Sequence, residues 1–150
     1  MNDPYEEYEQ MCKVVREENV ELLSGFEKWL REKGLSKKTI KKHVSNTDFY
    51  INQCLCSEDP PQMAAEGVSG INYFLGYWFI RKAMWSGPTS IRENAGSLKK
   101  FYAYMTIIGQ VEKDDYDELR AEIKEGLPEW IATVNRYDDP DLKFEDVWRW

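Results

Sequence analysis

The stretch FEKWLREKGLSKKTIKKHVSNTDFY, residues 26–50, decides the fold. Its first part completes a pattern of apolar residues at three- and four-residue steps that begins near Tyr5, which predicts a helix. Lys33 and Gly34 then give a C-terminal stop, because glycine adopts the left-handed conformation at little cost. Ser36 follows as an N-cap residue. The stretch therefore predicts two helices joined by a tight connection.

Helical spacing of apolar residues continues through the rest of the chain, and no stretch alternates as a strand would. The third helix is apolar on nearly all sides up to Met84, which is typical of a helix at the centre of a bundle. Ser90 and Glu93 have the spacing of a capping box that opens the fourth helix. The expected helices cover residues 5–33, 36–55, 69–85, 90–109, 114–124 and 128–134, with a break at Asn19 left open. We therefore predict an all-α protein.

The composition indicates one folded domain. The 150 residues are 42% hydrophobic and 14% aromatic, which is enough to form a core and excludes a largely disordered chain. Mean hydropathy is −0.67, and no apolar run reaches the roughly 18 residues of a membrane helix. No signal peptide is recognisable, and three cysteines without framework spacing fit a reducing compartment. We expect a soluble cytoplasmic protein.

The net charge of −7 is unevenly distributed. Residues 1–35 hold five Lys or Arg and nine Asp or Glu, for −4, and residues 109–150 hold six and thirteen, for −7. Residues 36–108 hold nine and five, for +4. Because binding depends on the local field, the basic middle segment is a candidate surface for a polyanion. The acidic end is then either an ordinary solvated helix or an internal cover over that surface.

No motif of a catalytic site, a phosphate-binding loop or a metal site is present in the sequence. Cys12, Cys54, Cys56 and His43 lack the paired spacing of a zinc site. We interpret the cysteines as small buried residues and expect no cofactor. The C-terminal stretch from Trp148 to Trp150 either folds back on the bundle or contacts a partner, and both alternatives stay open.

Two segments taken together resemble a known module. Residues 26–50 fit the pattern F..WL...GLS..T...H......Y, and residues 87–105, GPTSIRENAGSLKKFYAYM, fit the pattern TS.R.....L..FY.Y. In this order, with a hydrophobic helix between them, they resemble the SAM-like core-binding domain of tyrosine recombinases and phage integrases over about residues 20–109. The resemblance implies a four-helix bundle that clamps one side of duplex DNA. Residues 1–19 and 110–150 are then helical extensions at the N-terminus and at the acidic C-terminus.

The resemblance implies DNA contacts from the start of the second helix and from the fourth helix. The residues at these positions are Ser36, Lys37, Lys38, Thr39, Lys41, Lys42, His43, Thr89, Ser90, Arg92, Lys99 and Lys100. Free N–H groups at helix N-termini and the cations of Lys and Arg both suit phosphate. The family's catalytic domain needs several Arg, Lys and His residues with a nucleophilic Tyr, whereas this chain has one His.

The sequence therefore predicts a non-catalytic DNA-binding module that contacts duplex DNA and is related to DNA recombination and integration. It predicts no enzyme activity and no membrane partner. The alternative is a helical protein-interaction or self-association domain that uses the acidic flanks and the C-terminal Trp residues.

Overall fold

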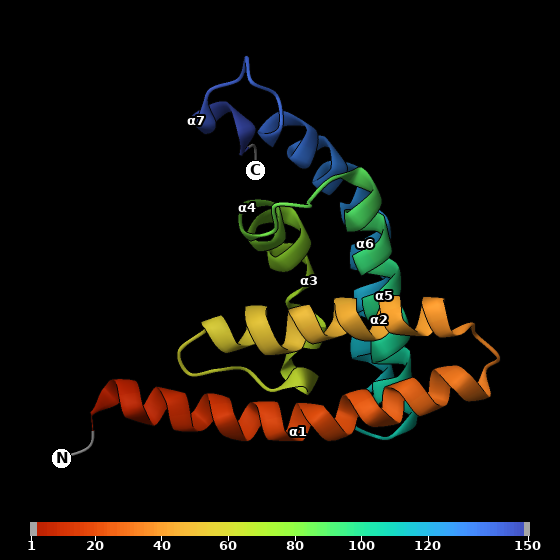
Figure 1. Ribbon diagram of the computed structural model, residues 1–150. Coiled ribbons are helices and arrows are strands. Elements are labelled where there is room, and N and C mark those ends of the chain that lie inside the picture. Colours follow the sequence, from red (N-terminus) through yellow and green to blue (C-terminus); the bar gives the residue numbers. More distant parts are fainter. Residues whose placement is uncertain (1–2, 149–150) are drawn as a thin grey trace.

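The chain folds into an all-α structure, which confirms the fold class predicted from the apolar spacing. The computed structural model describes residues 3–148, and no strand occurs in that range. Two antiparallel helix pairs form the frame: α1 (Pro4–Glu32) with α2 (Lys37–Asp48), and α5 (Pro88–Ile107) with α6 (Lys113–Tyr137). The pairs cross where α2 lies against α5, and shorter helices fill the angle between them (Figure 1).

The remaining helical segments are short. They are η1 (Phe49–Cys54), η2 (Leu55–Ser57), η3 (Ala64–Ser69), α3 (Ile71–Tyr73), η4 (Phe74–Trp78), α4 (Phe79–Lys82) and α7 (Phe144–Val147). Segments η1 and η4 have π-helical backbone, and η2 and η3 are 3₁₀ turns.

Helix α1 is uninterrupted, so Asn19 does not cap a second helix. Its side chain is buried instead, and Nδ2 donates to the backbone oxygen of Ile51 (3.3 Å) and to Oδ1 of Asn52 (2.8 Å). These bonds join α1 to η1. The expected boundary between residues 19 and 20 lies inside a continuous helix.

The predicted connection between the first two helices is confirmed. Gly34 has a φ of +83°, in the left-handed region, where glycine is favoured because it has no Cβ. Ser36 Oγ accepts a hydrogen bond from the N–H of Thr39 at 3.3 Å, which makes Ser36 the N-cap of α2. The expected apolar face is also present, since Ile40, Thr47 and Ile51 are buried.

The central helix forms as predicted but is shorter, because it runs from Ile71 to Lys82 through α3, η4 and α4. Phe74, Leu75 and Phe79 are fully buried within it. Met84 was expected on the same face, but this prediction is wrong. The backbone becomes extended at Ala83, so the helix ends there and the Met84 side chain is left in solvent.

Helix α5 begins at Pro88, earlier than the predicted capping box. Proline suits the first helical position, because the N–H that it lacks has no partner there. The hydroxyl of Ser90 accepts from the N–H of Gly87 at 2.9 Å and holds the loop before the helix. Glu93 does not complete a capping box; its carboxylate pairs with Lys42 on α2.

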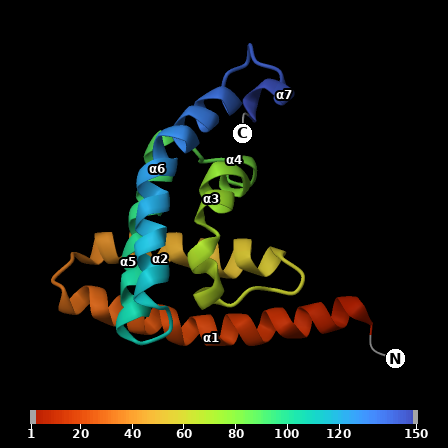
Figure 2. The same cartoon turned by 180° about the vertical axis from the view of Figure 1, so that it is seen from behind.

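Helix α6 is continuous, so the predicted interruption at residues 126–128 is wrong. The ring of Trp130 lies so close to Gly126 and Gly76 that a Cβ would meet it at 2.4 Å and 2.9 Å respectively. Gly126 therefore makes room for an indole ring rather than for a turn. Pro128 is exposed within the helix, and α6 changes direction in its second half (Figure 2), as expected where proline removes a backbone hydrogen bond.

Candidate nucleic-acid interface

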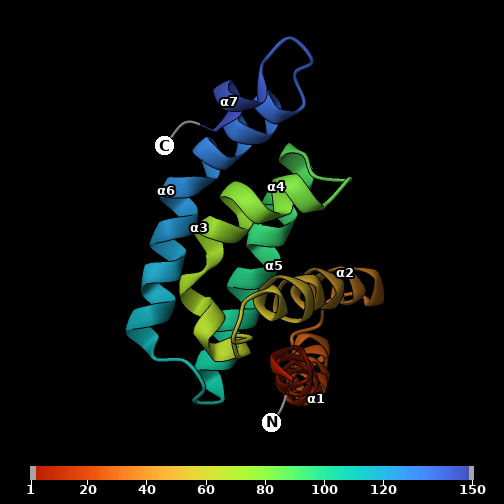
Figure 3. The same ribbon diagram turned by 90° about the vertical axis from the view of Figure 1, so that its left-hand side faces the viewer.

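The crossing of α2 and α5 brings two of the predicted site segments together. Figure 3 shows α5 between α2 on one side and α6 on the other. Lys42 Nζ lies 2.5 Å from Glu93 Oε1, and His43 Nδ1 lies 2.7 Å from Ser97 Oγ. These pairs are 51 and 54 residues apart in sequence. One surface is therefore built from two distant basic segments.

A short polar network fixes His43 at this crossing. Ser97 is fully buried, and its Oγ accepts a hydrogen bond from Asn46 Nδ2 at 3.0 Å. The same Oγ is hydrogen-bonded to His43 Nδ1 at 2.7 Å. The network therefore orients the imidazole ring.

The charge state of His43 follows from its surroundings. Partial burial is the main cause that lowers the pKa of the imidazole below its ordinary value, and the cations of Lys100 and Lys42 lower it further. Lys100 belongs to α5 and Lys42 to α2. Both helices therefore place a cation close enough to the ring to lower its pKa.

The other predicted residues of α2 divide between two sides of the helix. Lys38 is exposed on the outer face, whereas Lys37 and Lys41 line a shallow hollow toward α1 with Glu27 and Arg31. Ser36 and Thr39 are bonded to each other at 3.0 Å and shape the start of the helix. These last two residues have a structural role in the cap.

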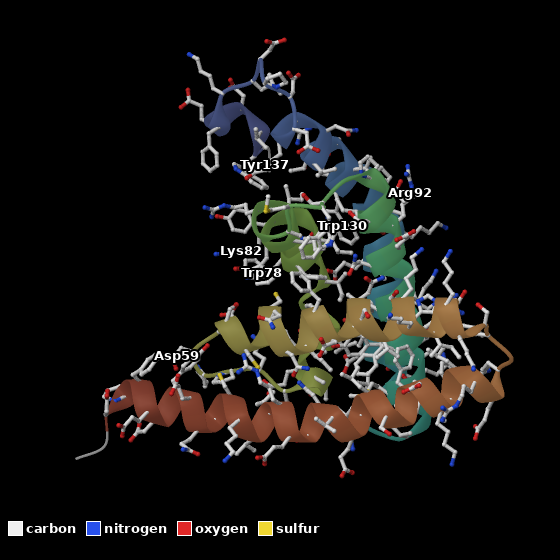
Figure 4. All side chains as sticks on the ribbon, viewed as in Figure 1. Asp59, Trp78, Lys82, Arg92, Trp130 and Tyr137 are labelled. Atoms are coloured by element: carbon white, nitrogen blue, oxygen red, sulfur yellow. The ribbon has the colours of Figure 1, made fainter. Side chains whose placement is uncertain are left out.

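The predicted residues of α5 are more widely spread. Thr89 and Arg92 are exposed near the start of the helix, and Arg92 points outward (Figure 4). Ser90 is engaged in the loop before the helix, where it also donates to the backbone oxygen of Trp85 at 3.1 Å. Lys99 faces α6 and lines a hollow with Asp117 and Lys124. The crossing therefore gathers Lys42, His43 and Lys100, but not Lys99.

The acidic helix α6 does not cover the lysines of α2, because α5 separates the two helices (Figure 3). It packs on α5 and buries Leu119 and Ile123, whereas its Trp130 ring lies against Gly76 of the central helix. Trp130 also donates from Nε1 to Oδ1 of Asn72 at 2.8 Å. The geometry favours a structural helix with a solvated acidic face over an internal cover.

The cysteines are buried, as the sequence analysis predicts. Burial raises the pKa of the Cys54 thiol to about 12, so the thiol is unreactive at neutral pH. Cys12 and Cys56 lie together against Tyr8, whose hydroxyl donates to the backbone oxygen of Cys56. Within residues 3–148, no three His, Cys, Asp or Glu side chains form a group that would hold a metal ion.

The C-terminal aromatic residues fold back where they are described. The ring of Trp148 lies 4.9 Å from that of Tyr77 and 5.9 Å from that of Tyr137. These contacts favour the alternative in which Trp148 folds back on the bundle over the one in which it contacts a partner. Trp150 lies outside the described residues.

The residues that sequence reasoning missed are the partners of the basic groups. Asn46, Glu93 and Ser97 hold Lys42 and His43 in place. A helical projection of α5 puts Glu93 and Ser97 on one face, because they are four residues apart. That face could be recognised from the sequence, but its contact with α2 could not.

Comparisons of the chain with protein family models, with curated proteins and with solved structures gave no match. In residues 3–148, no helix is both long and apolar enough to span a bilayer.

Proposed function

We propose that this chain is a non-catalytic DNA-binding module whose interface is formed by α2 and α5. The observation that carries the proposal is the crossing at Lys42, His43 and Lys100, which joins two basic segments into one surface. Lys38 adds a further exposed cation on the outer face of α2. A surface of this kind suits the evenly spaced phosphates of a nucleic-acid backbone.

The resemblance to the core-binding domain of tyrosine recombinases supports the same surface. In that family the second and fourth helices of a four-helix SAM-like bundle contact duplex DNA, and here the corresponding segments are α2 and α5. Two crossing helix pairs are compatible with such a bundle (Figure 1). In this interpretation α1, α2, the central helix and α5 form the bundle, and α6 extends it.

The expected binding mode is backbone recognition with few base contacts from α2 itself. Lysines position a protein on DNA through phosphate without reading sequence. The lowered pKa of His43 keeps the imidazole uncharged at neutral pH, so the ring adds no positive charge to this surface.

One observation favours a second candidate, a self-association domain. Tyr5, Met11, Val14 and Val20 are exposed on α1, and the N-terminal end of this helix extends beyond the rest of the fold (Figure 1). An antiparallel pairing of two such helices would cover these side chains. Self-association of this kind should be insensitive to salt, because it buries apolar surface.

A titration of the full chain against a mixed-sequence DNA duplex at several salt concentrations tests the proposal. If four to six phosphates are engaged, the logarithm of the affinity should fall with the logarithm of salt with a slope of roughly −4 to −5. Absence of binding at low salt would contradict the proposal. Light scattering on the same samples tests the self-association candidate, through a mass above the 17.7 kDa of one chain that is unchanged by salt.

A further inference from the structure

The loop between α4 and α5 presents two large apolar side chains to solvent. Met84 is 99% exposed and Trp85 is 61% exposed. Hydrogen bonds hold this loop: the N–H of Ser86 donates to the backbone oxygen of Ala83 at 3.1 Å, and Ser90 Oγ donates to that of Trp85 at 3.1 Å. These hydrogen bonds hold the loop in a defined position, with the Met84 side chain in solvent and the Trp85 ring more than half exposed.

Trp85 lies at the end of the basic stripe on α2. Its ring is 5.3 Å from that of Phe49 and 6.3 Å from that of Phe79. Phe49 follows α2 directly and lies on the same side of the helix as Lys38 and Lys42, because these residues recur at helical spacing. Its ring is half-buried and packs on the core. Seven residues of helix separate Lys42 from Phe49, which corresponds to about 10 Å along the axis. A ligand strand that contacts Lys38 and Lys42 would reach Trp85 next.

Cations flank the apolar pair on its other sides. Lys82 ends α4, and Arg92 lies in the early part of α5. Arg81 instead donates to the Tyr77 hydroxyl and lies over the Phe144 ring. Figure 4 shows Lys82 and Arg92 on opposite sides of the loop. The acid nearest to Lys42 is Glu93, with which it is paired. A ligand that fits here carries negative charge on its outside and flat apolar surfaces between the charges, which is the chemistry of a nucleic acid.

We propose that Met84 and Trp85 form an apolar wedge that contacts the bases of a bound DNA duplex while the lysines of α2 contact its phosphates. This inference rests on the proposed DNA-binding function and assigns it a contact outside α2 and the α5 helix. Apolar side chains of this size open and kink base steps when they enter the minor groove, and an indole ring stacks on any base. This role accounts for the exposed apolar surface of Met84 and Trp85.

The test compares three single variants with the wild-type chain by fluorescence anisotropy on a mixed-sequence duplex at several salt concentrations. Met84→Ser removes the wedge tip and leaves the core intact, because the side chain is almost wholly in solvent. Ile107→Ser is the matched control, since Ile107 is 64% exposed at the opposite end of α5. Lys38→Gln removes one cation from the stripe.

We expect Met84→Ser to weaken binding about tenfold at every salt concentration without changing the slope, because base contacts release no counterions. Lys38→Gln should reduce the magnitude of the slope by about 0.9, and Ile107→Ser should leave affinity and slope unchanged. A duplex that contains 2-aminopurine gives a second readout. Its fluorescence should rise when the wild-type chain opens the stack and should rise less with Met84→Ser.

Wild-type affinity in Met84→Ser, together with an intact salt slope, would overturn the wedge and leave the proposed function standing. Absence of salt-dependent binding by the wild-type chain would overturn both. Vesicles with an anionic lipid surface provide the competing ligand. If Met84→Ser loses binding to these vesicles while duplex binding is unaffected, the loop contacts a membrane surface and the wedge is wrong.

Discussion

Helix α5 makes two different kinds of contact, one with α6 and the other with α2. Against α6 it packs through apolar side chains, among them Leu119 and Ile123. Against α2 the contact includes polar and charged pairs, Lys42–Glu93 and His43–Ser97. The apolar contact between α5 and α6 removes a large area from water, and such burial is the main stabilising contribution in a folded protein. The polar crossing adds less stability but leaves its cations at the surface, where a ligand can reach them.

The largest expected effect comes from the apolar packing of α6, whose Trp130 ring lies against Gly76 of the central helix. Trp130→Ala should lower the free energy of unfolding by about 3–5 kcal/mol, because a buried ring is lost and a cavity is left. Asn72 Oδ1 would also lose its donor. Urea denaturation measures the change. The control Ile107→Ala should stay within about 0.5 kcal/mol, since this side chain is exposed, and equal losses would contradict the difference between the two sides.

Two glycines allow a second comparison, because one lies next to a buried ring and the other faces open space. Gly126→Ala places a methyl group 2.4 Å from the Trp130 ring, and we expect it to cost about 1–3 kcal/mol. Gly96→Ala in α5 meets nothing within 4 Å, so the better helix propensity of alanine should stabilise the protein by about 0.5–1 kcal/mol. Thermal unfolding distinguishes them by sign, and stabilisation by both changes would show that the ring does not occupy this space.

These two glycines also show which features could be predicted from the sequence. The stop at Gly34 and the N-cap at Ser36 are local, since each depends on a few neighbouring residues, and both predictions are confirmed. The role of Gly126 depends on Trp130 and on the central helix, so the predicted break there is wrong. Local signals alone do not distinguish a glycine that ends a helix from one that admits a ring.

For the candidate site, too, the sequence predicts some features, and others depend on the tertiary structure. The basic residues of α2 and α5 could be named from the sequence, but their grouping depends on the crossing. Lys100 approaches His43 while its neighbour Lys99 faces α6, because consecutive residues of a helix point in different directions. Asn46 and Ser97 carry no signal of their own, since polar residues at such positions are usually solvated.

A smaller effect is expected at the polar crossing. Ser97→Ala should lower the free energy of unfolding by about 1–2 kcal/mol, because Asn46 and His43 lose their shared partner. It should also shift the pKa of His43, because the ring loses its hydrogen-bond partner. The chain has a single histidine, so an NMR titration reports this pKa without ambiguity. Ser45→Ala on the exposed face of α2 is the control and should leave the pKa unchanged.

The pH dependence of stability follows from the same group. The folded-state pKa of His43 lies below its ordinary value, so between these two values the unfolded chain binds a proton that the folded chain does not. The stabilising contribution is therefore present above about pH 6.5 and is lost as the pH falls toward the folded-state pKa. Urea denaturation across this range should show the loss, and His43→Gln should abolish its part of it.

The most direct test of the central claim compares charge reversal on the two sides of α5. Lys38→Glu with Lys100→Glu changes the α2–α5 surface, and Lys124→Glu with Lys143→Glu changes the acidic C-terminal region. Each Lys→Glu reversal lowers the net charge by two, so each double variant lowers it by four, from −7 to −11. At low salt we predict a loss of duplex affinity of roughly 100-fold for the first pair and only a few-fold for the second. Equal losses in the two double variants would show that net charge alone governs binding and would contradict a DNA interface on α2 and α5.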